Sequence, residues 1–414
     1  MTPLQEIGKA AKKAAQTLSA ASEQVKNTAL ENIALMLAEN TEKILAENKK
    51  DLARAAESGM NESLIDRLTL TKERIEKIAE GVREVIALKD PIGELLEEIN
   101  RPNGLIIKKI RVPLGVIGII YESRPNVTVD AAILCLKCGN PVVLRGGKEA
   151  IHSNLALCAV MRAAIKKAGL PEDAVTVLSD TSRETAGELM RMNQYIDVLI
   201  PRGGASLIKT VCENATVPVI ETGVGNCHTY IDSRCDTEMA LRIVVNAKCQ
   251  RPSVCNAMET LLIHADMADS LLPKIGQAME NHHTEIRGCE KTRSILQNAT
   301  AATEEDYATE YNDYILTVKV VSSTEEAIAH IARYGSAHSE AIVTDIEENA
   351  ALFLQLVDAA AVYHNAATRF TDGYEFGLGA EIGISTQKMH ARGPMGLREL
   401  TSCKYLVLGT GQIR

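Results

Sequence analysis

The chain has 414 residues, of which 46% are hydrophobic and 24% are charged, a composition typical of a soluble globular protein with two or three domains. Its 45 Lys and Arg against 54 Asp and Glu give a net charge of -9, which excludes a general nucleic-acid surface because such a surface needs a basic face. No stretch approaches the roughly 18 consecutive apolar residues of a membrane span, so we expect a small-molecule partner.

The N-terminus and the cysteines indicate where the protein works. The segment MTPLQEIGKAAKKAAQTL contains Glu6 and no arginine, and it is interpreted as a first structural helix, not as a targeting peptide. The ten cysteines come without a secretory signal and are expected to be reduced. Both features predict a cytoplasmic protein whose thiols are available for chemistry.

The first part of the chain is predicted to be helical and to end in a hairpin. From residue 3 to about residue 88, apolar residues recur three and four positions apart, as on one face of a helix. Asn103-Gly104 then lies between two alternating runs, which is the strongest short-range signal for a β-hairpin.

Short apolar runs next alternate with helical segments. The runs cover residues 115–121, 141–145, 174–179, 196–200 and 217–221. Continuous apolar strands are buried on both faces, so these runs predict a parallel sheet covered by helices, with ligands at the carboxyl ends of its strands. A second α/β region follows Glu221, and residues 403–414 predict a final added strand.

Two glycine pairs mark the candidate cofactor site. The dinucleotide fingerprint G-x-G-x-x-G is absent, but two strands end alike, in Arg145-Gly146-Gly147-Lys148 and in Arg202-Gly203-Gly204. Glycine lets the main chain approach a ligand, and the N-terminus of the following helix attracts phosphates. Each pair alone is typical of a tight strand-to-helix turn. Both together favour a phosphate-bearing cofactor, and the charges of Arg145 and Lys148 suit NADP.

Cys255, in the stretch QRPSVCNAMET, is the candidate nucleophile. Most free cysteines simply pack in a core. This one is predicted to lie after the last strand of the first sheet, where the second region begins, and domain boundaries often hold ligand sites. Arg251 could supply the positive field that favours a thiolate. A thiolate there could attack an activated acyl group, and hydride from the cofactor could then reduce the thioester to an aldehyde.

Three segments give the chain a close resemblance to a known family. They are YESRPNVTVDAA at 121–132, QRPSVCNAMET at 250–260 and VVSSTEEAIAHIARYGSAHSEAI at 320–342. With them, essentially the whole chain resembles the aldehyde dehydrogenase superfamily and, within it, the γ-glutamyl phosphate reductases.

The resemblance implies roles for individual residues. Cys255 matches the family's nucleophile, and Asn126 matches the asparagine that stabilises the oxyanion together with the cysteine's backbone N–H. Glu221 matches the glutamate that activates water in hydrolytic members, but Val224 replaces a glycine of that element and a reductase needs no activated water. We therefore count Glu221 with the cofactor-binding residues, as we do Asp313.

The substrate's polar groups have four candidate partners, all expected in loops near the catalytic cysteine. They are Arg124, His338, Asn365 and Arg369. Guanidinium forks suit a carboxylate or a phosphate.

The implied architecture is α/β and like that of aldehyde dehydrogenases. Residues 1–93 and 113–225 would form a doubly wound NADP-binding domain, and residues 226–399 a catalytic domain. Residues 94–112 and 400–414 would form a small β flap for oligomerisation, because a homo-oligomer would cover the open edges of the hairpin.

The implied activity is NADPH-dependent reduction of L-glutamyl 5-phosphate to L-glutamate 5-semialdehyde with release of phosphate, in proline biosynthesis. A glutamate 5-kinase would supply the labile substrate and is a possible partner. The alternatives are a hydrolytic or CoA-acylating aldehyde dehydrogenase, a cysteine hydrolase or acyltransferase with His338 as base, and an inactive scaffold. No metal is expected, because Cys135 and Cys138 form a pair without a second pair at zinc spacing.

Overall fold

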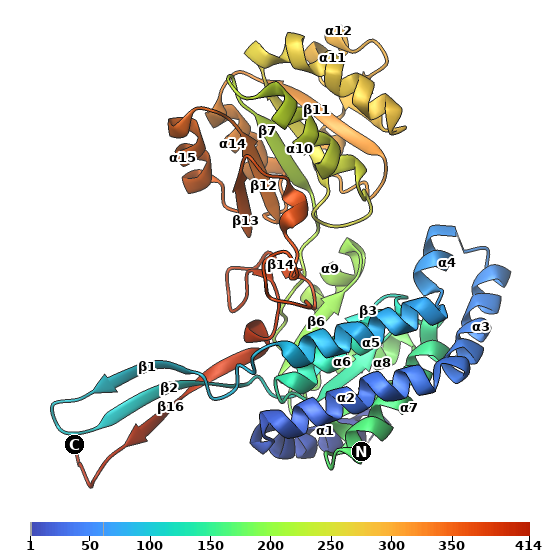
Figure 1. Ribbon diagram of the computed structural model, residues 1–414, viewed down its shortest axis with the longest axis vertical. Helices are drawn as coiled ribbons and strands as arrows, with labels where there is room; N and C mark the ends of the chain where they lie inside the picture. The colour runs from blue at the N-terminus through green and yellow to red at the C-terminus, as the bar shows by residue number, and fades with distance from the viewer. Residues whose placement is uncertain (1, 61) are drawn as a thin grey trace. The chain divides into compact units, whose positions relative to one another are not determined.

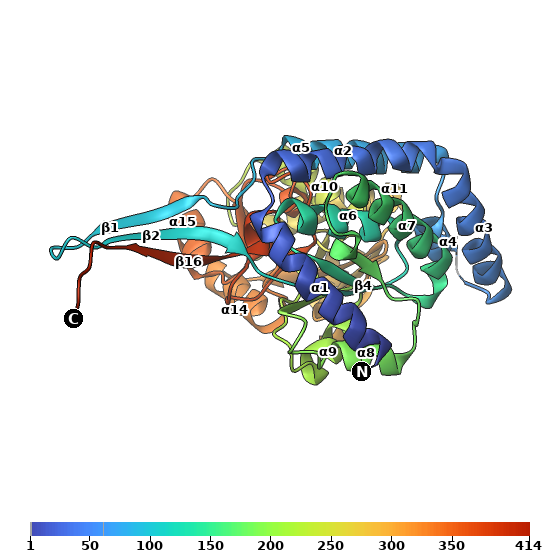
Figure 2. The same ribbon diagram turned by 90° about the horizontal axis from the view of Figure 1, so that it is seen from below.

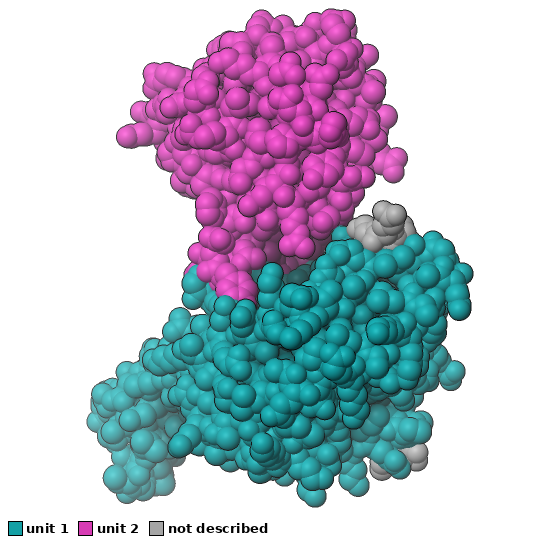
Figure 3. Space-filling model, turned by 45° about the vertical axis from the view of Figure 1, so that its right-hand side comes forward, with its two compact units in different colours: residues 1–222, 377–383, 395–414 teal, residues 223–376, 384–394 magenta. Residues whose placement is uncertain are grey.

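The computed structural model describes residues 2–60 and 62–414. They form two compact units, which Figure 3 shows in different colours. Unit 1 contains the chain up to Thr222 together with Gly377–Gly383 and Met395–Arg414, and unit 2 contains Gly223–Phe376 and Ile384–Pro394. The division falls three residues before the boundary expected at 225, and the flap strands group with unit 1.

Unit 1 is built on a parallel sheet of order β5-β4-β3-β6. Its strands are β3 (Ile117–Tyr121), β4 (Val142–Arg145), β5 (Val175–Val177) and β6 (Val198–Arg202). Its helices are α1 (Pro3–Ala20), α2 (Glu23–Glu39), α3 (Thr41–Glu57), α4 (Glu62–Leu68), α5 (Lys72–Ala87), α6 (Pro125–Lys137), α7 (Ile151–Lys167), α8 (Arg183–Leu189) and α9 (Ala205–Asn214), with 3-10 turns η1 (Lys148–Ala150), η2 (Glu172–Ala174) and η4 (Arg398–Leu400).

Helices cover both faces of this sheet, as burial of its continuous apolar strands requires. On one face, α1, α8 and α9 share a core with the strands, in which Leu4, Leu189 and Val211 contact a cluster that includes Ile120 and Leu199. On the other face α6 and α7 pack on the strands, and α2 and α5 pack on α6 and α7 (Figures 1 and 2). This arrangement confirms the expected covered parallel sheet.

The flap is an antiparallel sheet of order β1-β2-β16, made of β1 (Leu95–Asn100), β2 (Ile106–Pro113) and β16 (Thr401–Leu408). Gly104 has φ +86° at the turn between β1 and β2, a conformation open to glycine. Asn103-Gly104 thus makes the predicted hairpin, and the predicted C-terminal strand pairs with it. Figure 1 shows the strands extending away from the helices of unit 1.

The prediction of a strand at residues 217–221 is wrong. Only an isolated bridge joins Val219 to Leu199 in β6. Pro218 has no N–H to donate, so a ladder cannot continue through it. Its carbonyl accepts one hydrogen bond, from Leu199 N at 2.8 Å.

Unit 2 is built on a second parallel sheet, of order β10-β9-β11-β8-β7-β12-β13. Its strands are β7 (Cys227–Ile231), β8 (Met258–His264), β9 (Glu285–Gly288), β10 (Thr300–Ala301), β11 (Ile315–Val321), β12 (Ser339–Val343) and β13 (Ala361–His364), and a small antiparallel pair is formed by β14 (Ile384–Ser385) and β15 (Gly393–Pro394). Its helices are α10 (Thr237–Cys249), α11 (Ala265–Asn281), α12 (Glu290–Ile295), α13 (Glu304–Tyr307), α14 (Thr324–Tyr334) and α15 (Glu347–Leu356), with a 3-10 turn η3 (Thr368–Phe370).

The two faces of this second sheet carry separate cores. Leu261 belongs to the core formed with α10 and α11, whereas its neighbour Leu262 belongs to the core formed with α14 and α15, where it meets Phe353. Successive residues of a strand point to opposite faces, so β8 serves both layers. No helix in the described ranges is long and apolar enough to cross a membrane.

Candidate active site

Cys255 lies in unit 2, in the short segment between the end of α10 and the start of β8. It is half-buried. The segment turns tightly at this point, because Ala257 N donates to the Val254 carbonyl at 3.0 Å. The turn leads the chain from a helix end into a fully buried strand, so the cysteine lies at the edge of a rigid core.

Gly225 and Cys227, at the start of β7, contact the main chain of Cys255. A Cβ atom added to Gly225 would lie 1.7 Å from the Cys255 carbonyl oxygen, so only glycine fits there. Gly225 N donates to Glu310 Oε1 at 2.9 Å, and Cys227 Sγ donates to the Cys255 carbonyl at 3.2 Å. Asn226, between them, is buried and donates through Nδ2 to two backbone carbonyls.

The residue after Cys255 is held in place as well. Asn256 is buried, and its Nδ2 donates to the carbonyls of Arg369 at 3.2 Å and Thr371 at 2.9 Å. Thr368 Oγ1 in turn donates to the Asn256 carbonyl at 2.7 Å. The η3 turn therefore fixes the position of the peptide that follows Cys255.

Two guanidinium groups supply positive charge near the thiol. Arg369 Nε donates to Gln250 Oε1 at 3.2 Å, which lays this side chain along the segment that carries Cys255. Burial lowers the pKa of Arg369, the charge of Arg251 lowers it further, and a Cys255 thiolate raises it. Arg369 therefore lies within electrostatic reach of both Arg251 and the Cys255 thiol. Positive charge at such a site favours the thiolate, which is the nucleophilic form.

Two other candidates in unit 2, Asn365 and Asp313, make hydrogen bonds to residues other than Cys255. Asn365 has both amide atoms bound to Thr344, through Nδ2 to its carbonyl at 3.0 Å and through Oδ1 from its N–H at 3.0 Å. Asp313 accepts from Tyr314 N at 2.8 Å at the entry to β11. The glutamate that reaches the segment around Cys255 is instead Glu310, whose pKa burial raises.

His338, which was expected to bind substrate, lies in unit 2 directly before β12. The side chain is fully buried, and its Nδ1 lies 2.8 Å from Ser339 Oγ and 3.7 Å from Cys227 Sγ. It is buried because β12 is an interior strand, between β7 and the edge strand β13, and every residue of β12 is buried.

Asn126 lies in unit 1, on the exposed first turn of α6. Its Nδ2 donates to Asp130 Oδ2 at 3.0 Å, one turn further on. Burial raises the pKa of Asp130 to about 6, against the lowering effect of Asn126 and Arg202. An amide nitrogen carries two N–H groups, so Asn126 keeps one donor beyond its bond to Asp130. Arg124, the residue before this helix, is its N-cap and donates N–H to the Glu122 carbonyl at 2.7 Å.

The first glycine pair follows β4, at the carboxyl end of the unit 1 sheet. Arg145 Nη2 donates to the carbonyls of Thr181 and Ser182. Its Nε is buried and has no hydrogen-bond partner among the described residues, so a donor is available for an anion here. Lys148 is exposed, and the 3-10 turn η1 separates this pair from α7.

The second glycine pair follows β6. Gly204 N donates to Glu122 Oε1 at 3.0 Å, and a Cβ at Gly203 would lie 2.6 Å from the Glu122 side chain. The carboxylate of Glu122 thus lies at the N-terminus of α9, where the helix dipole favours negative charge. Glu221 accepts from Cys212 Sγ of α9 at 3.1 Å, and burial, with help from Glu221, raises the pKa of Cys212 to about 12.

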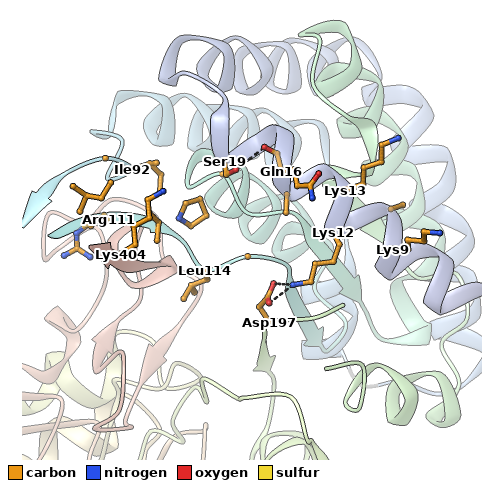
Figure 4. Close-up of a pocket in the computed structure, with 18 of the residues that line it drawn as sticks. Lys9, Lys12, Lys13, Gln16, Ser19, Ile92, Arg111, Leu114, Asp197 and Lys404 are labelled. Atoms are coloured by element: carbon orange, nitrogen blue, oxygen red, sulfur yellow. Dashed lines mark hydrogen bonds and ion pairs between the residues drawn. The ribbon is translucent and has the colours of Figure 1, made fainter. Parts of the chain in front are cut away.

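A pocket in unit 1 contains none of the expected site residues. Figure 4 shows Lys12 of α1 reaching Asp197, which receives its Nζ at 2.6 and 2.7 Å. Asp197 also accepts from Val116 N at 2.7 Å. Asp197 and Val116 directly precede β6 and β3, so the pocket lies at the amino ends of the strands. Ligands of open parallel sheets bind at the opposite edge, so we assign this ion pair to the attachment of α1.

Sequence reasoning did not single out Gly225, Cys227 or Glu310. Gly225 belongs to the stretch VIETGVGN, in which the resemblance points to Glu221 and Val224, and Cys227 opens the strand that follows. A glycine directly before a buried strand is a signal for a close approach of two backbones and could have indicated Gly225. Nothing in the sequence spacing brings Glu310 to it.

Comparisons with known proteins agree with this geometry. Residues 4–293 match the aldehyde dehydrogenase family. The chain is 62% identical over 414 residues to the gamma-glutamyl phosphate reductase of Carboxydothermus hydrogenoformans and 58% identical to that of Listeria monocytogenes, covering 100% of each chain in both cases. The crystal structure of gamma-glutamyl phosphate reductase from Thermotoga maritima is 49% identical and superposes with a TM-score of 0.98, covering 100% of both chains. An acetylating aldehyde dehydrogenase from Geobacillus thermoglucosidasius, 16% identical with a TM-score of 0.73 and covering 99% of this chain and 97% of that one, shares the fold.

Proposed function

The chain belongs to the γ-glutamyl phosphate reductases of the aldehyde dehydrogenase family, and from this premise we propose that it reduces L-glutamyl 5-phosphate to L-glutamate 5-semialdehyde and phosphate with NADPH. The observation that carries the proposal is the placement of Cys255. It is half-buried, held on both sides by main-chain contacts, and lies within the field of Arg369.

The chemistry assigned to the chain's own residues is acyl transfer. The Cys255 thiolate attacks the acyl carbon, the carbon–oxygen bond to phosphate breaks, and a thioester forms. Asn126 and the Cys255 N–H donate to the oxygen that becomes negative in this step, and such donors each contribute about 3 to 4 kcal/mol to catalysis. We assign Arg251 and Arg369 to the departing phosphate, for which guanidinium groups are suited. Arg124 remains a candidate for the substrate's α-carboxylate.

The cofactor assigned to unit 1 is NADPH, which when bound supplies the hydride that converts the thioester to the aldehyde. What supports a fit at the carboxyl end of β4 is the buried Arg145 Nε, which has no hydrogen-bond partner among the described residues; Gly146 and Gly147 are needed there because a Cβ would meet Asn154 or Glu149. Lys148 adds charge for a 2'-phosphate. We also assign Gly203, Gly204, Glu221 and Asp313 to the cofactor's side; Glu310 is the carboxylate found beside Gly225.

The remaining assignments concern partners. Exposed apolar residues on the flap support a homo-oligomer. A labile acyl phosphate favours direct delivery by a glutamate 5-kinase. The ten cysteines are free, which supports the reducing conditions of the cytoplasm.

The reaction run in reverse tests the proposal. NADPH formation from L-glutamate 5-semialdehyde and NADP is measured by absorbance in phosphate buffer and in a phosphate-free buffer, for the wild type and for Cys255→Ala. We expect activity that requires both phosphate and the thiol. Activity without phosphate would instead indicate a hydrolytic dehydrogenase with Glu221 as base, and activity that requires CoA would indicate the acylating class.

A further inference from the structure

A second thiol, that of Cys227, contacts the main chain of Cys255. Cys227 is the first residue of β7 and is fully buried. Its register partner in β8 is Met258, three residues after Cys255, so the pairing of the two strands brings Cys227 to this segment. Its Sγ donates to the Cys255 carbonyl at 3.2 Å.

The environment keeps Cys227 protonated. Burial raises its pKa well above the usual value, and the charges of Glu340 and of a Cys255 thiolate raise it further. A thiol that retains its hydrogen is a donor, whereas the nucleophile must lose its hydrogen. The two cysteines are therefore suited to different tasks, Cys255 to attack and Cys227 to donate.

A chain of buried polar groups continues behind Cys227. His338 Nδ1 lies 3.7 Å from Cys227 Sγ and 2.8 Å from Ser339 Oγ. Ser339 Oγ lies 2.6 Å from Thr371 Oγ1, and the Thr371 carbonyl accepts from Asn256 Nδ2 at 2.9 Å. The chain thus begins at the carbonyl of Cys255 and ends at the side chain of the next residue.

We propose that Cys227 is a positioning residue, whose thiol, held in place by His338, Ser339 and Thr371, fixes the Cys255 carbonyl and with it the orientation of the nucleophile. The inference rests on the proposed function of Cys255 as the nucleophile. The Gly225 contact limits how far the carbonyl can move, and the Cys227 hydrogen bond selects its direction. A correctly oriented nucleophile reacts faster without binding substrate more tightly, so the effect belongs to kcat.

The test compares Cys227→Ala, which removes the donor, with Cys227→Ser, which keeps one. Two quantities are measured: kcat and KM in the reverse assay, and the rate at which iodoacetamide alkylates Cys255, followed by the mass of its peptide. We expect Cys227→Ala to lower kcat about tenfold, which is the effect of losing one hydrogen bond, and to leave KM unchanged. The same variant should also slow the alkylation of Cys255. Cys227→Ser should stay within about threefold of the wild type.

Cys249→Ala is the matched control, because Cys249 is a buried thiol of the same unit whose contacts are Met279 and Thr284. It should leave kcat unchanged. Wild-type kcat in Cys227→Ala, or a Cys227→Ser as slow as Cys227→Ala, overturns the inference. Where Cys227→Ala does not fold, Ser339→Ala decides: a lower kcat with unchanged KM supports the proposal, and a wild-type kcat overturns it.

The two readouts keep this inference separate from the proposed function. An active Cys255→Ala would refute the proposed function, whatever Cys227 does. An inactive Cys255→Ala together with a fully active Cys227→Ala would refute the positioning role alone.

Discussion

The roles of Gly225 and Asp130 depend on where they lie in the fold and not on their residue type. Gly225 binds nothing through a side chain, yet the missing Cβ is what allows the main chain to lie against the Cys255 carbonyl. Asp130 is a common surface residue type, yet burial raises its pKa to about 6 where it meets Asn126. Both positions lead to predictions that a substitution can test.

The first prediction concerns Gly225→Ala. A Cβ would overlap the Cys255 carbonyl oxygen at 1.7 Å, so the nucleophile's segment must shift, and a shift of about 1 Å can cost a hundredfold in rate. We expect kcat to fall at least about a hundredfold. Gly187→Ala is the control, since no atom lies within 4 Å of a Cβ there. Equal activity of the two variants would show that the contact has no catalytic role.

The second prediction concerns Asp130 and pH. Because the folded-state pKa is raised, from 3.8 to about 6, the folded protein binds this proton more tightly than the unfolded chain. The contribution of Asp130 to stability is therefore full below about pH 4 and is lost as pH rises through 6. Asp130→Asn removes this dependence and keeps an acceptor for Asn126. Its free energy of unfolding, measured with urea and taken relative to that of the wild type, should rise by about 2 kcal/mol between pH 4.5 and pH 7. A constant difference would contradict the shift.

At the scale of elements, a buried ion pair joins α10 to β8 on either side of the nucleophile's segment. Lys248 Nζ lies 2.5 Å from Glu259 Oε2, and both side chains are fully buried. Glu259 also accepts from Asn312 N at 3.2 Å. Burial raises the pKa of Glu259 to about 7, against the lowering effect of Lys248. The pair fixes where the helix ends and the strand begins, and so the span that Cys255 occupies.

Lys248→Met is predicted to destabilise unit 2 by about 3 to 5 kcal/mol, because it leaves Glu259 buried without its partner. Adding Glu259→Gln removes the charge and keeps an acceptor for Asn312, so the double variant should recover most of the loss. Urea unfolding at pH 7 measures both. Lys274→Met, which breaks an exposed pair with Glu238, should cost less than about 1 kcal/mol. A double variant no more stable than Lys248→Met would contradict the reasoning.

At the scale of the whole molecule, the flap exposes apolar side chains on strands with open edges. Leu95 is 51% exposed, and Tyr405 and Val407 are each 57% exposed. Exposed apolar strands at a sheet edge favour pairing with another chain. The flap is therefore the surface through which we expect the protein to self-associate.

Tyr405→Glu combined with Val407→Glu is predicted to convert a homo-oligomer into a monomer, because two charges would be buried in the contact. Light scattering at micromolar concentration measures the mass. Lys9→Glu, an exposed change on α1, should leave the oligomer intact. A wild type that is already monomeric would refute the assignment.

Much of the architecture could be predicted because its signals are local. Asn103-Gly104 forms the hairpin turn, and the apolar runs predicted at 115–121 and 141–145 contain the buried parallel strands β3 and β4. The prediction was wrong at 217–221, where Pro218 breaks the ladder, and β9 and β10 were missed because they are short and partly polar.

The sequence alone predicted Cys255 as the nucleophile and determined most of the helices and strands of unit 1, because these depend on motifs and periodicities within a few residues. Only the tertiary structure decided what surrounds Cys255. Gly225 and Cys227 reach it through strand pairing, Glu310 binds Gly225 from a loop far along the chain, and His338 is buried directly before β12. Contacts between distant segments depend on how strands are ordered in a sheet, and no local pattern of residue types encodes that order.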